Sequence, residues 1–117
     1  MRMNVLGHGV MGVQVAGLMQ VLGHEVYVWT RTVSDERVKR QSQVVKLLKR
    51  ALALSSEGGR CEIVHTLSAL APALTIESLP ESLDIKRSIL SQLSYGITDV
   101  EFFTNTSSLA PDRKSVV

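Results

Sequence analysis

The 117-residue sequence contains one cysteine, Cys61, and only 4% aromatic residues. A single cysteine excludes an internal disulfide and a metal site built from several cysteines, and it fits a reducing compartment. The scarcity of aromatic side chains argues against a surface on which nucleic-acid bases stack. The charge is nearly balanced, with 13 Lys and Arg residues against 11 Asp and Glu residues, so no nucleic-acid partner is expected.

Long uninterrupted hydrophobic runs are also missing. The apolar N-terminal region differs from a signal peptide or a membrane span because it is interrupted by Gly7, His8, Gly9, Gly12, Gln14, Gly17, Gln20 and Gly23. We therefore expect a cytoplasmic protein with no membrane partner. The length and the hydrophobic content of 44% suit one domain with an ordinary core.

A glycine-rich turn, Gly7-His8-Gly9-Val10-Met11-Gly12, separates an apolar strand pattern from an apolar helix pattern. In a dinucleotide-binding turn, Gly7 allows the tight turn, Gly9 lets the backbone approach a pyrophosphate, and Gly12 allows close packing of helix on strand. The start of the helix offers free N–H groups and a positive dipole end to the phosphates. The same spacing recurs by chance in loops, but this context favours dinucleotide binding over a merely structural turn.

Strand and helix patterns alternate along the rest of the sequence. Strands are expected at 3–6, 25–30, 61–65, 73–79 and 100–104, and helices at 10–22, 36–54 and 80–93, with a short helical turn at 67–70. The alternation predicts an α/β fold with a doubly wound, Rossmann-like parallel sheet in the order 3-2-1-4-5. We expect residues 1–109 to form this single domain and residues 110–117 a polar tail.

The helix at 36–54 has clear end and face signals. Ser34 and Asp35 can cap its start. Its apolar seam is expected to consist of Val38, Val45, Leu48 and Leu52, with the basic residues facing the solvent. Of these basic residues, only Arg37 is near enough to the start of the helix to help bind a phosphate.

Three blocks of sequence together indicate a known family. They are the glycine turn with Gly23-His24-Glu25-Val26, the segment Glu77-Ser78-Leu79-Pro80-Glu81 followed by Lys86, and Asn105-Thr106-Ser107-Ser108-Leu109. In this order and spacing they resemble the N-terminal coenzyme-binding domain of 3-hydroxyacyl-CoA dehydrogenases, over roughly residues 2–109.

The resemblance implies an NAD(P)-dependent oxidoreductase whose substrate is an acyl-CoA-type molecule. It places Glu81 and Lys86 near the nicotinamide and its ribose, and Ser107 where the nicotinamide meets the 3-hydroxyl group of the substrate. No metal site is implied. The candidate cofactor-binding residues are Gly7, Gly9, Val10, Met11, Gly12, Thr30, Arg31, Leu79, Glu81, Lys86 and Asn105.

Simpler interpretations of these residues stay open. Glu81 could close a capping box with Ser78. Arg31 could be an ordinary solvated arginine, and Asn105 and Ser107 could be turn formers after a strand. The imidazole of His8, where the family usually has a small residue, could either point outward or crowd the pyrophosphate.

The sequence departs from the family at the end of the second strand. The family usually has an acidic residue there, which accepts hydrogen bonds from the adenosine ribose, whereas this chain has Thr30-Arg31-Thr32. A hydroxyl and a guanidinium would accept a 2′-phosphate that a carboxylate would repel, so we expect NADP at least as much as NAD. The Arg-Thr pair resembles that of NADP-using beta-hydroxyacid dehydrogenases, whose glycine turn also carries a Met at the position of Met11.

The second departure concerns catalysis. The family's catalytic His follows a sixth strand and pairs with a later Glu, and its helical second domain comes after that; the sequence ends at Val117 before all three. None of His8, His24 and His65 matches the catalytic position. We therefore expect this chain alone to be inactive. Two alternatives are a non-catalytic module that binds or senses NADP(H) and a degenerate chain that binds nothing.

The missing sixth strand leaves a sheet edge, which predicts a homodimer or a tail along that edge.

Overall fold

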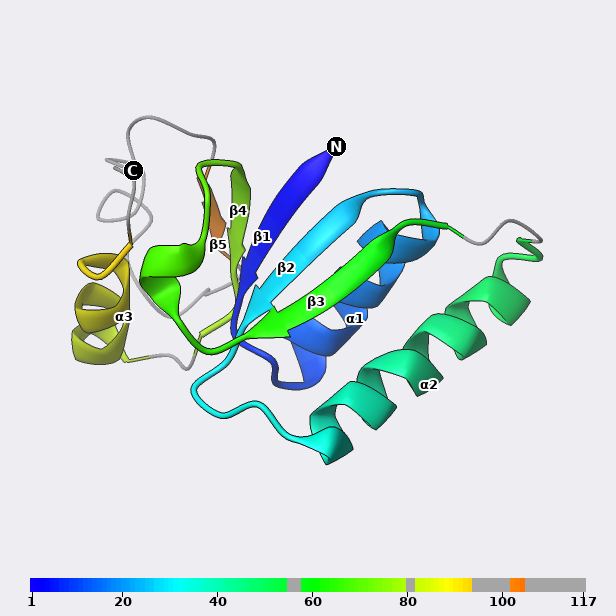
Figure 1. The fold of residues 1–117 in the computed structure, drawn as a ribbon, viewed down its shortest axis with the longest axis horizontal. Helices are drawn as coiled ribbons and strands as arrows, with labels where there is room; N and C mark the ends of the chain where they lie inside the picture. The colour runs from blue at the N-terminus through cyan, green and yellow to red at the C-terminus, as the bar shows by residue number, and fades with distance from the viewer. Residues whose placement is uncertain (55–57, 80–81, 94–101, 105–117) are drawn as a thin grey trace.

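The computed structural model describes residues 1–54, 58–79, 82–93 and 102–104. The elements, in chain order, are β1 (Arg2–Leu6), α1 (Val10–Val21), β2 (Glu25–Trp29), α2 (Asp35–Ala51), β3 (Arg60–Val64), the 3-10 turn η1 (Leu67–Ala69), β4 (Leu74–Glu77), α3 (Leu83–Leu90) and β5 (Phe102–Thr104). The strands of this described part pair in parallel in the order β3-β2-β1-β4-β5 (Figure 1). The predicted fold class and strand order are confirmed.

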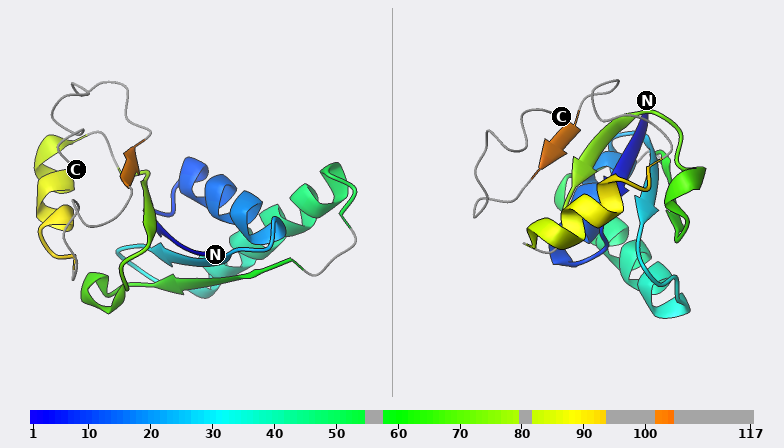
Figure 2. Two further views of the ribbon diagram at one scale, coloured as in Figure 1. Left: turned by 90° about the horizontal axis from the view of Figure 1, so that it is seen from above. Right: turned by 90° about the vertical axis from the view of Figure 1, so that its left-hand side faces the viewer.

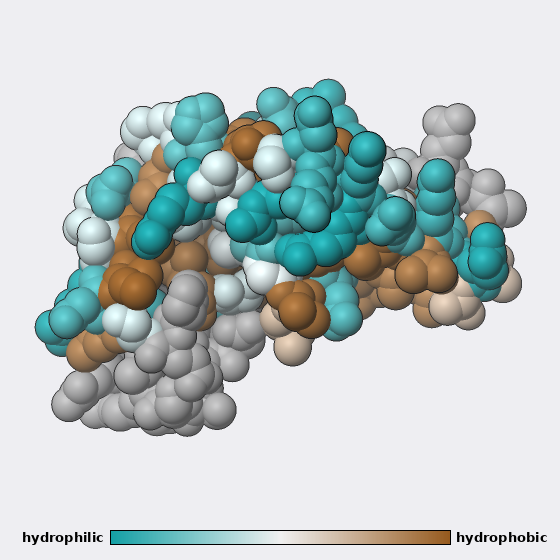
Figure 3. Space-filling model, turned by 90° about the horizontal axis from the view of Figure 1, so that it is seen from below, coloured by the Kyte–Doolittle hydropathy of each residue, from teal (hydrophilic) through white to brown (hydrophobic). Residues whose placement is uncertain are grey.

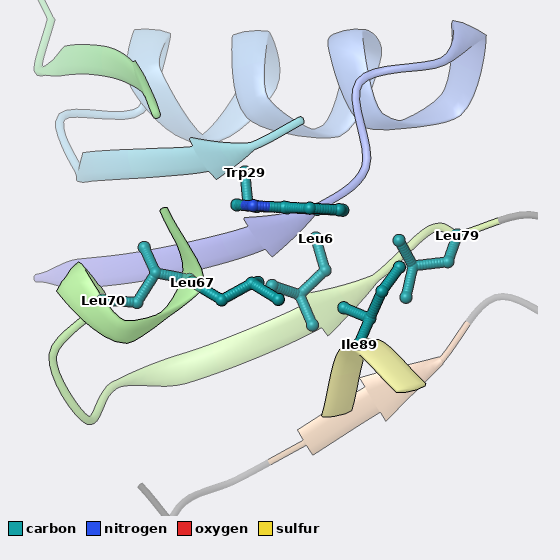
Figure 4. Close-up of a cluster of buried hydrophobic side chains, with 6 residues drawn as sticks. All are labelled: Leu6, Trp29, Leu67, Leu70, Leu79 and Ile89. Carbon is teal, nitrogen blue, oxygen red and sulfur yellow. The ribbon is translucent and has the colours of Figure 1, made fainter. Parts of the chain in front are cut away.

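Both faces of the sheet are covered, as a parallel sheet requires. On one face, valines of β1 and β2 pack against Ala16 of α1, and α2 packs in turn on α1 (Figures 1 and 2). On the other face, Leu6 and Trp29 pack against η1, the segment after β4, and α3 (Figure 4). Since neighbouring residues of a strand point to opposite faces, Val5 and Leu6 belong to different halves of the core.

The two helices on the first face fit together at a glycine. A Cβ atom on Gly17 of α1 would lie 3.0 Å from Cγ1 of Val44 in α2, so a larger residue would require the Val44 side chain to shift by a few tenths of an ångström. The N-cap of α2 is Ser34, whose Oγ accepts a hydrogen bond from the backbone N–H of Arg37 at 3.2 Å. The predicted cap is therefore confirmed.

The predicted apolar seam of α2 is partly wrong. Val45 is buried, but Val38 and Leu52 are 50% and 47% exposed, and the polar residue Gln41 is buried in the seam instead. Val38 lies in the first turn of α2 and Leu52 is its C-cap, so both are at the ends of the helix, whereas the contact with Gly17 of α1 is made by Val44 and Leu48. Gln41 can occupy the central position because its amide forms hydrogen bonds within the packed helices.

The start of α3 also differs from the prediction. The helix begins at Leu83 rather than residue 80, and its N-cap is Ser82, whose Oγ accepts from the backbone N–H of Ile85 at 3.4 Å. Ser78 is therefore not the N-cap of this helix, and the capping box proposed between Ser78 and Glu81 depends on a residue outside the described part of the chain. Pro80 and Glu81 lie outside the described residues, as does the predicted tail 110–117. Of the described helices, none combines the length and apolar character needed to cross a membrane.

Candidate functional site

A cavity of about 650 Å³ opens at the carboxyl end of the sheet. Its walls come from the glycine turn after β1, the segment after β2, the segment after β4, and α2 and α3. This is the point where the strand order changes direction. The chain runs from β1 outward to β2 and β3, and it then returns to form β4 on the other side of β1. In open α/β sheets, ligands bind at such a switch point beyond the carboxyl ends of the strands.

Two glycines of the turn are required by the fold itself. Gly7 has φ +106, and a Cβ there would lie 2.7 Å from the carbonyl oxygen of Ser78. A Cβ on Gly12 would lie 2.2 Å from the carbonyl oxygen of Gly7. A larger residue at Gly7 would therefore push the turn away from the segment after β4. A larger residue at Gly12 would collide with the backbone of the turn itself.

Gly9 is different, because the described structure gives no internal reason for a glycine. Its φ of −78 and ψ of −164 suit any residue, and a Cβ placed there meets no atom within 4 Å apart from those of Gly9 and its two chain neighbours. The space in front of Gly9 is thus open, which is the arrangement that lets a ligand approach the backbone. This fits the role predicted for Gly9.

The first turn of α1 offers unsatisfied backbone donors beside this space. Gly9 is the N-cap, it provides no side-chain acceptor, and the first turn contains no acidic residue. The first intrahelical acceptor is the Gly9 carbonyl, which receives the N–H of Val13 at 3.0 Å, so the earlier N–H groups have no helical partner. Val10 and Met11 are 74% and 51% exposed. The donors and the helix dipole together form an anion-binding site.

The imidazole of His8 is held inside the protein and does not point outward as one prediction had it. The residue is 3% exposed, and its Nε2 lies 2.8 Å from Oε1 of Gln41. Gln41 uses its amide nitrogen to donate to the Val13 carbonyl at 3.2 Å, so its oxygen accepts from the Nε2–H of His8. Burial lowers the pKa of His8; the Gln41 bond opposes this shift, while the charges of Arg40 and Arg37 add to it.

Two arginines of α2 reach back to the glycine turn. The carbonyl oxygen of His8 accepts from Nη1 of Arg37 at 3.1 Å and from Nη2 of Arg40 at 2.6 Å. Sequence reasoning expected only Arg37 and missed Arg40, although a spacing of three residues places both on one face of the helix. Among the described residues, no carboxylate forms an ion pair with either arginine.

The end of β2 supplies the neighbouring wall. Thr30 is buried and its N–H donates to the Val64 carbonyl at 2.9 Å, while Arg31 and Thr32 are exposed and line the cavity. The described residues that line this cavity include three arginines and no acidic side chain. Seen from below, hydrophilic side chains form a broad area across the middle of the molecule (Figure 3). Because its described lining has three arginines and no acidic side chain, the cavity wall is electropositive.

The opposite wall is largely apolar. It includes Leu79, which is 5% exposed, together with Ile85 and Ile89 of α3. The backbone N–H of Leu79 donates to Oε2 of Glu77 at 2.8 Å, which fixes the segment after β4. Ser78 lines the cavity as well, and sequence reasoning did not select it for binding. Its Oγ is buried with no hydrogen-bond partner in the part of the chain that is described.

The remaining predicted site residues divide into two groups. Lys86 is buried in an ion pair with Glu77, whose side chain is 2% exposed, and Lys86 does not line the cavity. Its contact with a cofactor stays a prediction. Glu81, Asn105 and Ser107 lie outside the described residues, so their roles stay predictions too. Within residues 1–54, 58–79, 82–93 and 102–104, no group of three His, Cys, Asp or Glu residues could hold a metal ion.

The sequence and the fold were compared with known proteins. A family model described as "3-hydroxyacyl-CoA dehydrogenase, NAD binding domain" matches residues 2–115. A comparison with curated protein sequences gave no match. A diketoreductase solved in a study of dicarbonyl catalysis aligns with a TM-score of 0.69 and 24% identity, over 95% of this chain and 43% of its own.

A second solved structure, the dehydrogenase part of multifunctional enzyme 1 from C. elegans, also aligns with a TM-score of 0.69. It is 23% identical and covers 99% of this chain and 28% of its own. At these identities the two structures show a shared fold. The chain spans less than half the length of either protein.

Proposed function

The chain belongs to the 3-hydroxyacyl-CoA dehydrogenase NAD-binding domain family and binds NAD(P), and from this premise we propose that it is the coenzyme-binding part of an enzyme that moves a hydride between NAD(P) and a 3-hydroxyacyl-CoA-type substrate. The observation that carries the proposal is the open backbone at Gly9. A glycine that the fold does not need, placed beside unsatisfied helix donors, is explained by a pyrophosphate that must come close.

The residues around the cavity fit a dinucleotide from end to end. The backbone of Gly9, which lines the cavity, and that of Val10 and Met11, which begin α1 next to it, would bind the pyrophosphate. Thr30 and Arg31 would bind the adenosine ribose, and Leu79 would border the nicotinamide half. The nicotinamide supplies the hydride chemistry when it is bound. The contribution of the described chain is binding and orientation, with the apolar wall at Leu79, Ile85 and Ile89 keeping water away.

Several finer parts of the proposal rest on the resemblance to the family. Ser107 would face the 3-hydroxyl group of the substrate, and Glu81, Lys86 and Asn105 would contact the nicotinamide half. The substrate class would place the protein in fatty acid metabolism. The single cysteine and the interrupted apolar N-terminal region, rather than the family, support the cytoplasm as its compartment. A homodimer would cover an exposed edge of the sheet.

A second candidate function is binding or sensing of NADP(H) without catalysis by this chain. The positions of the histidines favour it. The imidazole of His8 is tied to Gln41, His24 precedes β2 at the opposite end of the sheet, and His65 follows β3 and lines a different cavity. Within the described structure, His24 and His65 lie away from the larger cavity, and His8, although it lines that cavity, has its imidazole bound to Gln41 and is not free to act as a general base.

Two measurements separate these functions. Trp29 is the only tryptophan in the sequence and lines the cavity, so its fluorescence should change as NADH or NADPH is added. Reduction of acetoacetyl-CoA is then assayed on the same protein. Turnover would support catalysis by this chain, whereas coenzyme binding without turnover would favour the binding module. Absence of any fluorescence or calorimetric response at millimolar coenzyme would contradict both.

A further inference from the structure

A second hollow adjoins the larger cavity at the start of α2. It has a volume of about 400 Å³ and is lined by Thr32, Ser34, Glu36, Arg37 and Arg40. Thr32, Arg37 and Arg40 line both cavities, so the two spaces share one wall. This wall lies directly beyond the end of β2, where the adenosine ribose of a dinucleotide lies in this fold.

The two arginines of this wall are held in place but retain donors. Both guanidinium groups donate to one acceptor, the His8 carbonyl, at 3.1 and 2.6 Å. Each guanidinium has five N–H donors, and within the described residues neither arginine is paired with a carboxylate. The Ser34 cap fixes the first turn of α2, so the positions of both arginines are set by the fold. Planar groups with free donors bind phosphate oxygens well.

The end of β2 removes the usual obstacle to a phosphate. A carboxylate there would bind the free 2′-hydroxyl of NAD and repel the 2′-phosphate of NADP. In this chain the buried Thr30 and the exposed Arg31 occupy that segment. Provided that the proposed function holds, we propose that Arg37 and Arg40 form the subsite for the 2′-phosphate of NADP(H) and give the chain its preference for this coenzyme.

One nearby group opposes the phosphate. Asp35 and Glu36 occupy the first turn of α2, so the helix terminus itself is unsuited to an anion, and the arginine side chains must bind it instead. Glu36 also lines the smaller hollow. Removing its charge with Glu36→Gln should therefore strengthen NADPH binding by about 2- to 5-fold, since exposed charge pairs have effects of this size.

The test compares NADPH and NADH on the 117-residue chain by Trp29 fluorescence and calorimetry. The native chain should bind NADPH more tightly. Arg37→Gln combined with Arg40→Gln should weaken NADPH binding by about 10- to 100-fold and change NADH binding by less than about 2-fold, as expected for loss of hydrogen bonds to a charged group. Arg31→Ala should weaken NADPH binding as well, but by a smaller factor. Lys46→Gln, an exposed position of the same helix, is the matched control and should change neither.

A competition measurement isolates the 2′-phosphate. Adenosine 2′,5′-bisphosphate should displace NADPH from the native chain better than ADP does, and this advantage should vanish in the double variant.

Equal affinity of the native chain for NADH and NADPH would overturn the inference while leaving coenzyme binding intact. An equal loss of both coenzymes in the double variant would overturn it too, because the arginines would then act only by shaping the glycine turn. Failure of both coenzymes to bind the native chain would overturn the proposed function as well.

Discussion

The imidazole Nε2 of His8 lies 2.8 Å from Oε1 of Gln41, and both residues are buried. His8 belongs to the glycine turn and Gln41 to the face of α2 that packs on α1. The contact therefore connects the phosphate-binding loop to the packing of the two helices. A residue that looks out of place in the turn has a structural role, since it fixes the loop from behind while the backbone of Gly9 stays open in front.

Replacing Gln41 with Leu should loosen this connection. The substitution leaves Nε2 of His8 without its partner and removes the side-chain donor to the Val13 carbonyl, so we expect the free energy of unfolding to fall by about 1–3 kcal/mol. Coenzyme affinity should fall as well, because the loop is less well fixed. Urea denaturation and fluorescence titration measure the two effects. Gln43→Leu, on the exposed face of the same helix, is the control; equal stability of the Gln41 and Gln43 variants would contradict the role assigned to Gln41.

Stability should depend on pH through His8. Burial lowers the pKa of His8 below its usual value of 6.5, so the unfolded chain binds a proton more readily than the folded chain. The contribution of His8 to stability is therefore fully present above pH 6.5, and it is lost as the pH falls from there toward the lowered pKa of the folded state. Urea unfolding between pH 5 and about 8 should show this decline. In a His8→Gln variant the decline should be smaller; an unchanged pH profile would contradict the assignment to His8.

The buried ion pair of Lys86 and Glu77 gives a third prediction. Lys86→Met removes the cation and leaves a buried carboxylate, which should lower the free energy of unfolding by about 3–5 kcal/mol. Adding Glu77→Gln should restore part of the loss, since the carboxylate that lost this cation is then replaced by a neutral amide. Thermal unfolding of the native, single and double variants measures this coupling. A double variant that is no more stable than Lys86→Met would show that the pair has no such energetic role.

The sequence alone was sufficient for the parts of the fold that local patterns determine. The turn at Gly7 to Gly12, the cap at Ser34 and the parallel strand order all follow from residue types at short spacing and from the right-handed rule for crossovers. The start of α3 was misplaced because Ser78 and Ser82 are both acceptable caps in sequence. Only the chain path after β4 distinguishes them, with the helix beginning at Leu83.

The missed features of the site depend on contacts between distant residues. His8 meets Gln41 across 33 positions, and Arg40 reaches the His8 carbonyl across 32. No local pattern indicates that one carbonyl in the glycine turn will accept from both arginines. A buried Gln in the seam of α2 was unexpected for the same reason, because the hydrogen bonds that make its burial acceptable come from α1 and the turn.

Binding of NADH and NADPH to a Gly9→Ser variant tests the central claim most directly. Gly9 is the N-cap of α1 with an extended backbone, and serine is a preferred residue at such a position, so the variant should be at least as stable as the native chain. The serine side chain would enter the space that a pyrophosphate needs and its Oγ would compete for the helix donors. We predict a loss of affinity of at least about 10-fold for both coenzymes, with native stability in urea. Native affinity for both coenzymes in a folded Gly9→Ser variant would contradict the account.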